Sequence, residues 1–259
     1  RDNIGGDGSP WIFSAGVGGA GGIDANTSGI AAGPLILTNC RIVNNSGGDG
    51  QSSQFGGGLG GGGGLSISGA GVRLLHCTIA RNIGGDVVGG GTVGAGGIQV
   101  RQLGAFAEIV NSIVWNNVDV LGTTSQIATL NGTSTANSSN VEGGFAGAGN
   151  IQTNPQFRDA PNGDYRLTGQ SPCIDAGDGS VAGLPLLDFE GDPRLITGNV
   201  DMGVDEACQL GTADGFDLTS LVDGLGDAHR CWKAALPGNV VQLTIPPPAA
   251  AIVGKVGVG

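Results

Sequence analysis

The chain has 259 residues, of which 54 are glycine, and its formal net charge is −11. The glycines follow no strict Gly-X-Y period, which excludes collagen, and a hydrophobic content of 39% excludes a disordered chain. The negative charge argues against nucleic acid or anionic lipid as a partner, and no apolar run reaches the roughly 18 residues of a membrane span. We therefore expect the glycines to lie in ordered structure with turns and close backbone packing.

The first residues already match the end of a repeat, because Asn3-Ile4-Gly5-Gly6-Asp7 recurs in related form later in the chain. The sequence starts at Arg1, without a methionine or a signal peptide. We expect either that further coils lie upstream in a precursor or that this open end meets another molecule.

The repeat consists of three segments that align without gaps, at residues 37–45, 74–82 and 109–117, with offsets of 37 and 35. In each segment an aliphatic residue is followed by Asn or His, then by Cys or Ser, then by Ile or Val, and finally by Asn. A Gly-Gly-aliphatic stretch precedes each segment, at residues 21–23, 63–65 and 96–98. Short β-rich stretches at this period predict an all-β fold, a right-handed parallel β-helix with Gly-rich loops.

In such a solenoid, equivalent residues of successive coils lie about 4.8 Å apart. We therefore expect an apolar column of Ile42, Ile79 and Val114. We also expect an amide column, in which the side chains of Asn45, Asn82 and Asn117 bond to one another.

Five cysteines are present, and none forms a Cys-x-x-Cys pair that would indicate a zinc or redox motif. Cys40, Cys77 and Ser112 share one repeat position, where stacked free thiols are expected and a Cys40–Cys77 cross-link is the alternative. Cys208 and Cys231 flank a C-terminal segment. A disulfide between these two would suit an oxidising compartment, and buried thiols are the alternative.

The composition changes at Asn154, after which a series of short motifs follows. These are Pro155-Gln156-Phe157, Asp164-Tyr165-Arg166-Leu167, Ser171-Pro172-Cys173-Ile174-Asp175-Ala176-Gly177, the Asp-x-x-Gly-x-x-Arg motif at 188–194, and Val200-Asp201-Met202-Gly203-Val204-Asp205-Glu206. The ordered series resembles the end of bacterial choice-of-anchor Q proteins, which are right-handed parallel β-helix surface proteins. With the coils, the resemblance covers residues 20 to 206. It departs from the family at Cys173, where alanine is usual, and after Glu206. It implies secretion and surface display rather than an established enzymatic activity.

The residues themselves indicate that the segment 154–206, the C-terminal module, caps the solenoid by covering its last coil. Tyr165, Leu167, Ile174 and Met202 would supply the apolar contacts, and Arg166 and Arg194 would pair with carboxylates. The predicted domains are coils at 1–153, this module, a small segment at 207–245, and a proline spacer with an apolar tail strand at 246–259.

We expect a secreted, non-enzymatic structural or adhesive protein at the cell surface or in an extracellular filament, with other copies of itself, and surface glycans, as candidate partners. A polysaccharide lyase or glycosidase is the alternative, on fold analogy alone. The coil cations Arg41, Arg73, Arg81 and Arg101 have no evident acid cluster beside them. His76 replaces Asn in the repeat and is expected to be a turn-stacking residue.

Two aspartate sets suggest Ca²⁺, and with it a third hypothesis, a calcium-dependent glycan-binding module. Asp7, Asp49 and Asp86 share one repeat position, where their like charges would repel unless a cation bound or the loops splayed them into solvent. The second set is Asp175, Asp178, Asp188, Asp192 and Asp201, for which pairing with Arg194 is the competing explanation.

The tail is small and apolar after the stiff spacer Pro246-Pro247-Pro248. The residues that suit a strand are Ile252, Val253, Val256 and Val258. We expect this strand to add to the open coil edge of another molecule and to give head-to-tail filaments. The alternatives are a tail that folds back on its own chain and a remnant of an anchor.

Overall fold

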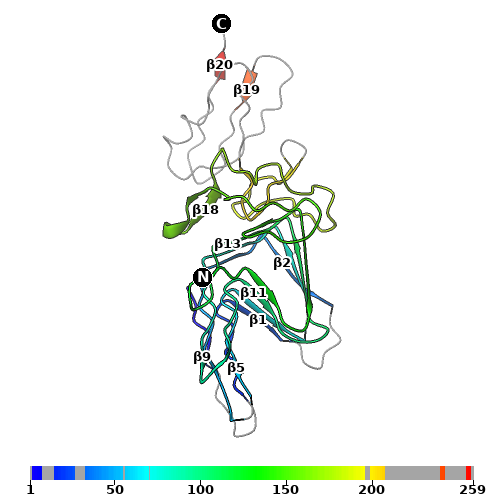
Figure 1. Cartoon of the computed structure of the whole chain (residues 1–259). Helices are drawn as coiled ribbons and strands as arrows, with labels where there is room; N and C mark the ends of the chain where they lie inside the picture. Colours follow the sequence, from blue (N-terminus) through cyan, green and yellow to red (C-terminus); the bar gives the residue numbers. More distant parts are fainter. Residues whose placement is uncertain are drawn as a thin grey trace.

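The structure is a computed structural model that describes residues 2–7, 15–26, 33–54, 56–69, 71–195 and 199–207, with the backbone of two short strands at 240–242 and 255–257. It is a parallel β-helix, as predicted. Three four-stranded parallel sheets form the sides of the coils (Figure 1). No helix in the described part of the chain is long and apolar enough to cross a membrane.

Each coil contributes one strand to each sheet. The first sheet contains β1 (Ile23–Asn26), β6 (Leu65–Ser68), β11 (Ile98–Val100) and β14 (Ile127–Thr129). The second contains β2 (Leu35–Thr38), β7 (Gly71–Leu75), β12 (Phe106–Val110) and β15 (Thr133–Asn137), and the third contains β3 (Arg41–Val43), β8 (Thr78–Ala80), β13 (Ile113–Trp115) and β16 (Asn140–Val141).

The register of the third sheet confirms the predicted repeat alignment. Ile42 pairs with Ile79, and Ile79 pairs with Val114, in the apolar column expected from the sequence. These side chains belong to one continuous core inside the coils. Equivalent apolar residues therefore bury one another along the whole stack.

The amide column is also confirmed, and it is longer than predicted. The side-chain amide of Asn45 donates to Asn82 Oδ1 at 2.9 Å, and that of Asn82 donates to Asn117 Oδ1 at 2.8 Å. Asn3 extends the column at one end and Gln126 at the other. Because all the central amides are buried, this column satisfies polar groups that water cannot reach.

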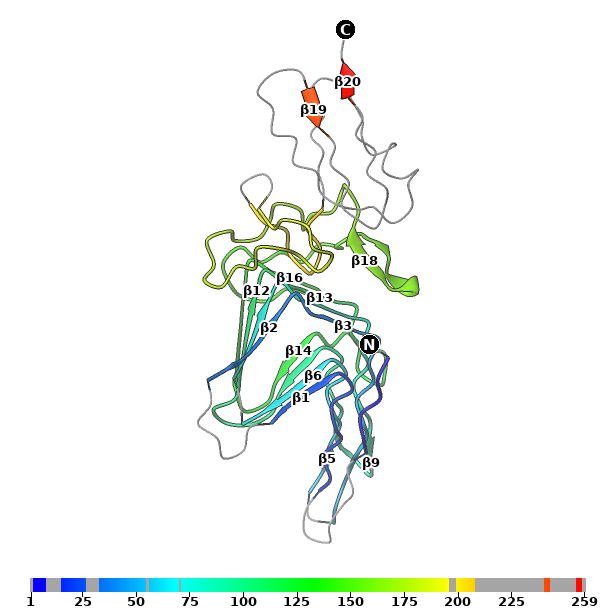
Figure 2. The same cartoon turned by 180° about the vertical axis from the view of Figure 1, so that it is seen from behind.

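Gly-rich loops run out from the coils and back, and form an arm that projects beside the first sheet (Figures 1 and 2). The arm contains β4 (Gly50–Gln51), β5 (Gly58–Leu59), β9 (Val87–Val88) and β10 (Gly91–Thr92). A continuous series of backbone hydrogen bonds runs through the arm. It joins, in alternation, glycines of the segments that leave the coils and glycines of the segments that return to them. Its members are Gly6, Gly19, Gly48, Gly61, Gly85 and Gly94. A Cβ at Gly61 would collide with the backbone of Gly19, which explains why this position has no side chain.

The C-terminal module lies on the outer face of the third sheet, as Figure 2 shows. Its hairpin contains β17 (Phe157–Asp159), the 3-10 turn Ala160–Asn162 and β18 (Asp164–Leu167). Tyr165 packs on Val43 and Ala80, whereas Leu167 and Met202 pack on Ile113. The module thus spans the flank of several coils, whereas the sequence predicted contacts with the last coil. The reason is that the outer face of the third sheet also carries apolar side chains, among them Val43, Ala80 and Ile113.

The tail contains β19 (Val240–Gln242) and β20 (Lys255–Gly257), which pair antiparallel within the same chain. Val256, one of the predicted assembly residues, lies opposite Val241 in this pair. Ile252, Val253 and Val258 lie outside the described residues, as do Cys208 and Cys231 of the predicted disulfide.

Candidate functional site

The first coil forms an open end of the stack. Its strands β1, β2 and β3 are the outer strands of the three sheets. An outer strand carries backbone N–H and C=O groups that are free to pair with a further strand. Leu35 occupies the register position of the buried Val72, yet it is 42% exposed because no coil covers it in the described part of the chain. Ile23, Leu37 and Cys40 also pack on the core while remaining partly exposed.

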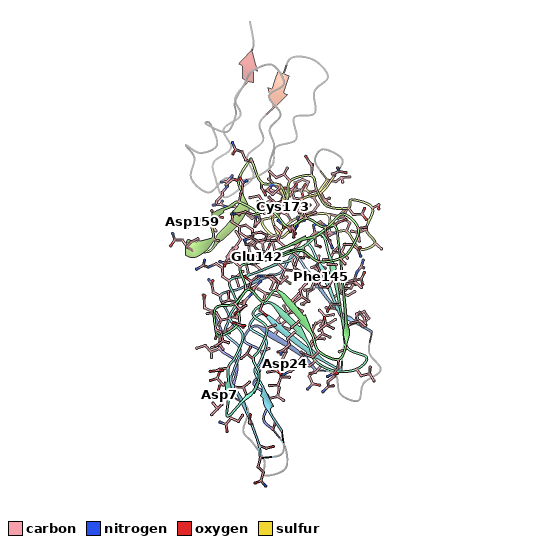
Figure 3. All side chains as sticks on the ribbon, in the orientation of Figure 1. Asp7, Asp24, Glu142, Phe145, Asp159 and Cys173 are labelled. Atoms are coloured by element: carbon pink, nitrogen blue, oxygen red, sulfur yellow. The ribbon has the colours of Figure 1, made fainter. Side chains whose placement is uncertain are left out.

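The opposite end of the stack is closed by residues 142–153, which follow β16. Val141 N–H donates to the Ile151 carbonyl at 3.0 Å, and Ser138 N–H donates to the Ala148 carbonyl at 2.8 Å. Phe145, labelled in Figure 3, packs on the main core. The two ends therefore differ among the described residues. Residues 142–153 pair with the last coil and cover its core, whereas residues 2–5 pair with the first coil only at residues 43–46 and leave β1 and β2 without an outer partner.

An exposed apolar loop lies beside the open end. Leu186 is 87% exposed, and Leu187 and Phe189 are about half exposed. Two hydrogen bonds hold this loop to the first coil: Asn39 Nδ2 donates to the Leu187 carbonyl, and an Arg194 guanidinium nitrogen donates to Asn39 Oδ1, both at 2.7 Å. The sequence pattern did not reveal this loop, because the loop contacts the first coil through residues that are far apart in the sequence. Leu187 and its partner Asn39, for example, are 148 positions apart.

The aspartates of the coil set stack as their repeat position predicts, and they have a structural role. Asp7 Oδ1 accepts the Asp49 N–H at 3.0 Å, and Asp49 Oδ1 accepts the Asp86 N–H at 2.8 Å. Each of these two carboxylates thus binds the backbone of the next coil. These hydrogen bonds partly offset the repulsion between the carboxylates.

The module aspartates are likewise engaged with backbone amides. Asp188 Oδ1 accepts three successive N–H groups, from Glu190, Gly191 and Asp192, each at 2.8 Å. Asp201 accepts the N–H groups of Asp175 and Ala207. Asp178 accepts the Ser180 hydroxyl and lies on the surface. Within the described residues, no group of three or more His, Cys, Asp or Glu side chains comes together in the manner of metal ligands.

Arg194 is the centre of the module. It is fully buried, lies 3.6 Å from Glu206 and donates to the carbonyls of Val204 and Asp205. Glu206 is its nearest carboxylate in the described residues, and two aspartates of the module set, Asp188 and Asp201, also act on it electrostatically, as the competing explanation proposed. Burial raises the pKa of Asp201 to about 6, of Asp205 to about 7 and of Glu206 to about 8.

Two titratable residues of the coils, His76 and Cys77, are buried. His76 adopts a left-handed turn conformation with φ of 51°, as Asn39 and Asn111 do, and its Nε2 contacts the Asn111 amide. Burial lowers its pKa to about 3, so the ring is neutral near pH 7. Cys40, Cys77 and Cys173 are free thiols, in agreement with the prediction for the first two.

Comparison with known proteins gives no match: no family model, no curated protein and no solved structure is similar to this chain. The assignment as a parallel β-helix therefore rests on the strand register, and the candidate site is the open end of its first coil.

Proposed function

We propose that this protein is an extracellular structural or adhesive β-helix that assembles through the open end of its first coil. The observation that supports this proposal most directly is the difference between the two ends. Residues 142–153 cover the last coil, whereas β1, β2 and β3 are outer strands with partly exposed core residues. The resemblance of residues 155–206 to choice-of-anchor Q proteins supports secretion and display on a bacterial surface.

Assembly would proceed by strand addition. The incoming strand would pair with the free backbone groups of an outer strand and would cover Leu35, while the exposed apolar loop at Leu186 would enlarge the contact. We propose the tail of a second copy, residues 246–259, as the donor, which gives a head-to-tail contact and an open filament. Because β20 pairs with β19 in its own chain, this short hairpin must open before donation. Isolated two-stranded hairpins are only marginally stable.

The test uses the full chain, a deletion of residues 246–259, and the variant Leu35→Lys, which places a charge at the open end. A control variant, Val88→Lys, puts the same charge on an exposed valine of the arm. We expect electron microscopy and light scattering to show filaments for the full chain and the control, and monomers for the deletion and for Leu35→Lys.

Two outcomes would contradict the proposal. Filaments that persist after the deletion would exclude the tail as donor, and filaments that persist in Leu35→Lys would exclude the open end. A full chain that remains monomeric at high concentration would refute assembly altogether.

A further inference from the structure

A groove of about 300 Å³ lies between the β17–β18 hairpin and the third sheet. The coil side is formed by residues at the ends of β8 and β13, including Arg81, Trp115 and Asn116. The module side includes Gln156, Phe157, Arg158 and Tyr165. The groove therefore brings together aromatic, amide and guanidinium side chains from segments that are distant in the sequence.

Two hydrogen-bond donors at this groove are buried and have no acceptor among the described residues. Tyr165 is only 2% exposed, and its hydroxyl lacks a partner; the Nε–H of Arg81 is also buried and unpaired. Burial raises the pKa of the Tyr165 phenol, so its hydroxyl keeps its proton near neutral pH. Buried donors are usually satisfied, and leaving one unpaired is costly. An acceptor from outside the described chain would satisfy both.

Two arginines lie near Tyr165, and Asp2 also acts on its phenol. Arg41 lies over its ring, with the guanidinium carbon 5.9 Å from the ring centroid, and both Arg41 and Arg81 act on its phenol. Neither arginine forms an ion pair within 4.0 Å in the part of the chain that the structure describes. The coil arginines Arg73 and Arg101, by contrast, lie near Glu108 and Asp24. The groove itself is lined by two arginines, Arg81 and Arg158, and by one carboxylate, Asp159, so its cations outnumber its anions, and this favours an anionic ligand.

We propose that this groove binds a carboxylate-bearing sugar residue of an acidic glycan. The carboxylate would accept hydrogen bonds from Arg81 and Tyr165. Trp115 and Phe157 would pack on the apolar face of the sugar ring, and the amides of Asn116 and Gln156 would bind its hydroxyl groups, since an amide both donates and accepts. The volume of the groove matches the small end of known ligand sites. This site does not depend on the assembly proposed above.

The test is calorimetric titration of the full chain with three probes. These are a trimer of galacturonic acid, the neutral galactose trimer, and a hexapeptide with a free C-terminal carboxylate. We expect the acidic trimer to bind at least 10-fold more tightly than the other two, with an affinity that falls as NaCl is raised.

Two variants test which residues bind the carboxylate of the acidic trimer. Tyr165→Phe removes only the hydroxyl, and Arg81→Ala removes the guanidinium; each should weaken binding of the acidic trimer about 10-fold. The control Arg73→Ala removes a coil arginine that pairs with Glu108 and should leave binding unchanged. Tyr165→Phe should also leave the melting temperature unchanged or raise it, because it removes a buried group that is unpaired in the free protein.

Several results would overturn the proposal. Equal binding of the acidic and neutral trimers, or no binding at millimolar concentration, would remove the carboxylate as the recognised group. Tighter binding of the peptide would assign the groove to a polypeptide terminus. Unchanged affinity in the Tyr165→Phe variant would show that the hydroxyl does not bind the ligand. A lower melting temperature of this variant, measured without ligand, would show that the hydroxyl stabilises the fold through a bound water.

Discussion

The coils and the C-terminal module bury their polar groups in different ways. In the coils, equivalent residues satisfy one another, as Asn45 and Asn82 do, so the same contact recurs at every turn of the solenoid. In the module, each polar contact occurs once, and most of them are carboxylates that accept backbone N–H groups around the single buried arginine Arg194.

This difference has consequences for stability. A repeated contact tolerates the loss of one member, because its neighbours keep the same arrangement. A contact that occurs once, with several buried carboxylates near one cation, depends on each partner and on pH. We therefore expect substitutions and pH changes to affect the module more strongly than the coils.

The largest effect is expected for Arg194→Ala. The substitution removes the ion pair with Glu206 and the bonds to Asn39, Val204 and Asp205. Loss of the central partner of such a buried network costs about 3–5 kcal/mol, because the buried Val204 and Asp205 carbonyls, and Asn39 Oδ1, lose their donor. Urea unfolding at pH 7 measures this loss. Arg166→Ala is the control; it removes a partly exposed pair with Asp164 and should cost about 1 kcal/mol or less. Equal losses in the two variants would show that Arg194 is not the centre of the module.

An intermediate effect is expected in the glycine arm, where Gly61→Ala would place a methyl group against the backbone of Gly19. Overpacking of this kind costs about 1–3 kcal/mol. Amide hydrogen exchange should show faster exchange at Gly48 and Gly85, on either side of the substitution. The control Gly6→Ala adds a methyl group to open space and should leave exchange in the arm unchanged. Unaltered protection in Gly61→Ala would contradict the close packing of the arm.

A third effect concerns the direction in which stability changes with pH. Burial raises the pKa of Asp201, Asp205 and Glu206 to about 6, 7 and 8, above the unfolded values near 4. The folded state therefore holds more protons between pH 4 and 8, and the free energy of unfolding decreases as pH rises through this window. Calorimetry should show a lower melting temperature at pH 8.5 than at pH 5, with the decrease falling between pH 5 and pH 8, where these groups lose their protons.

Asp205→Asn serves as the matched variant for this pH dependence. It retains an oxygen that can accept the Leu167 N–H but cannot ionise. The variant should lose less stability than the parent between pH 6 and 8. A parent protein whose melting temperature rises with pH over this range would contradict the assignment.

The sequence by itself determined the register of the coils. Residues 37–45, 74–82 and 109–117 carry the same pattern, and a parallel solenoid brings equal positions into contact, so the pairing of Ile42, Ile79 and Val114 followed from their spacing. The stacking of Asp7, Asp49 and Asp86 followed in the same way, although their role as acceptors of backbone N–H groups did not.

The tertiary structure decided how the non-repeating parts attach to the coils. A signal for the position of the module was present, because β13 is apolar at three successive residues, Ile113, Val114 and Trp115, and such a strand is buried on both faces. The pattern does not specify which segment covers that face. Contacts such as Arg194 with Asn39, Phe145 with the core, and Tyr165 with Ala80 join residues that share no repeat position. They depend on the fit between surfaces that exist only once the coils have stacked, and for that reason only the tertiary structure could reveal them.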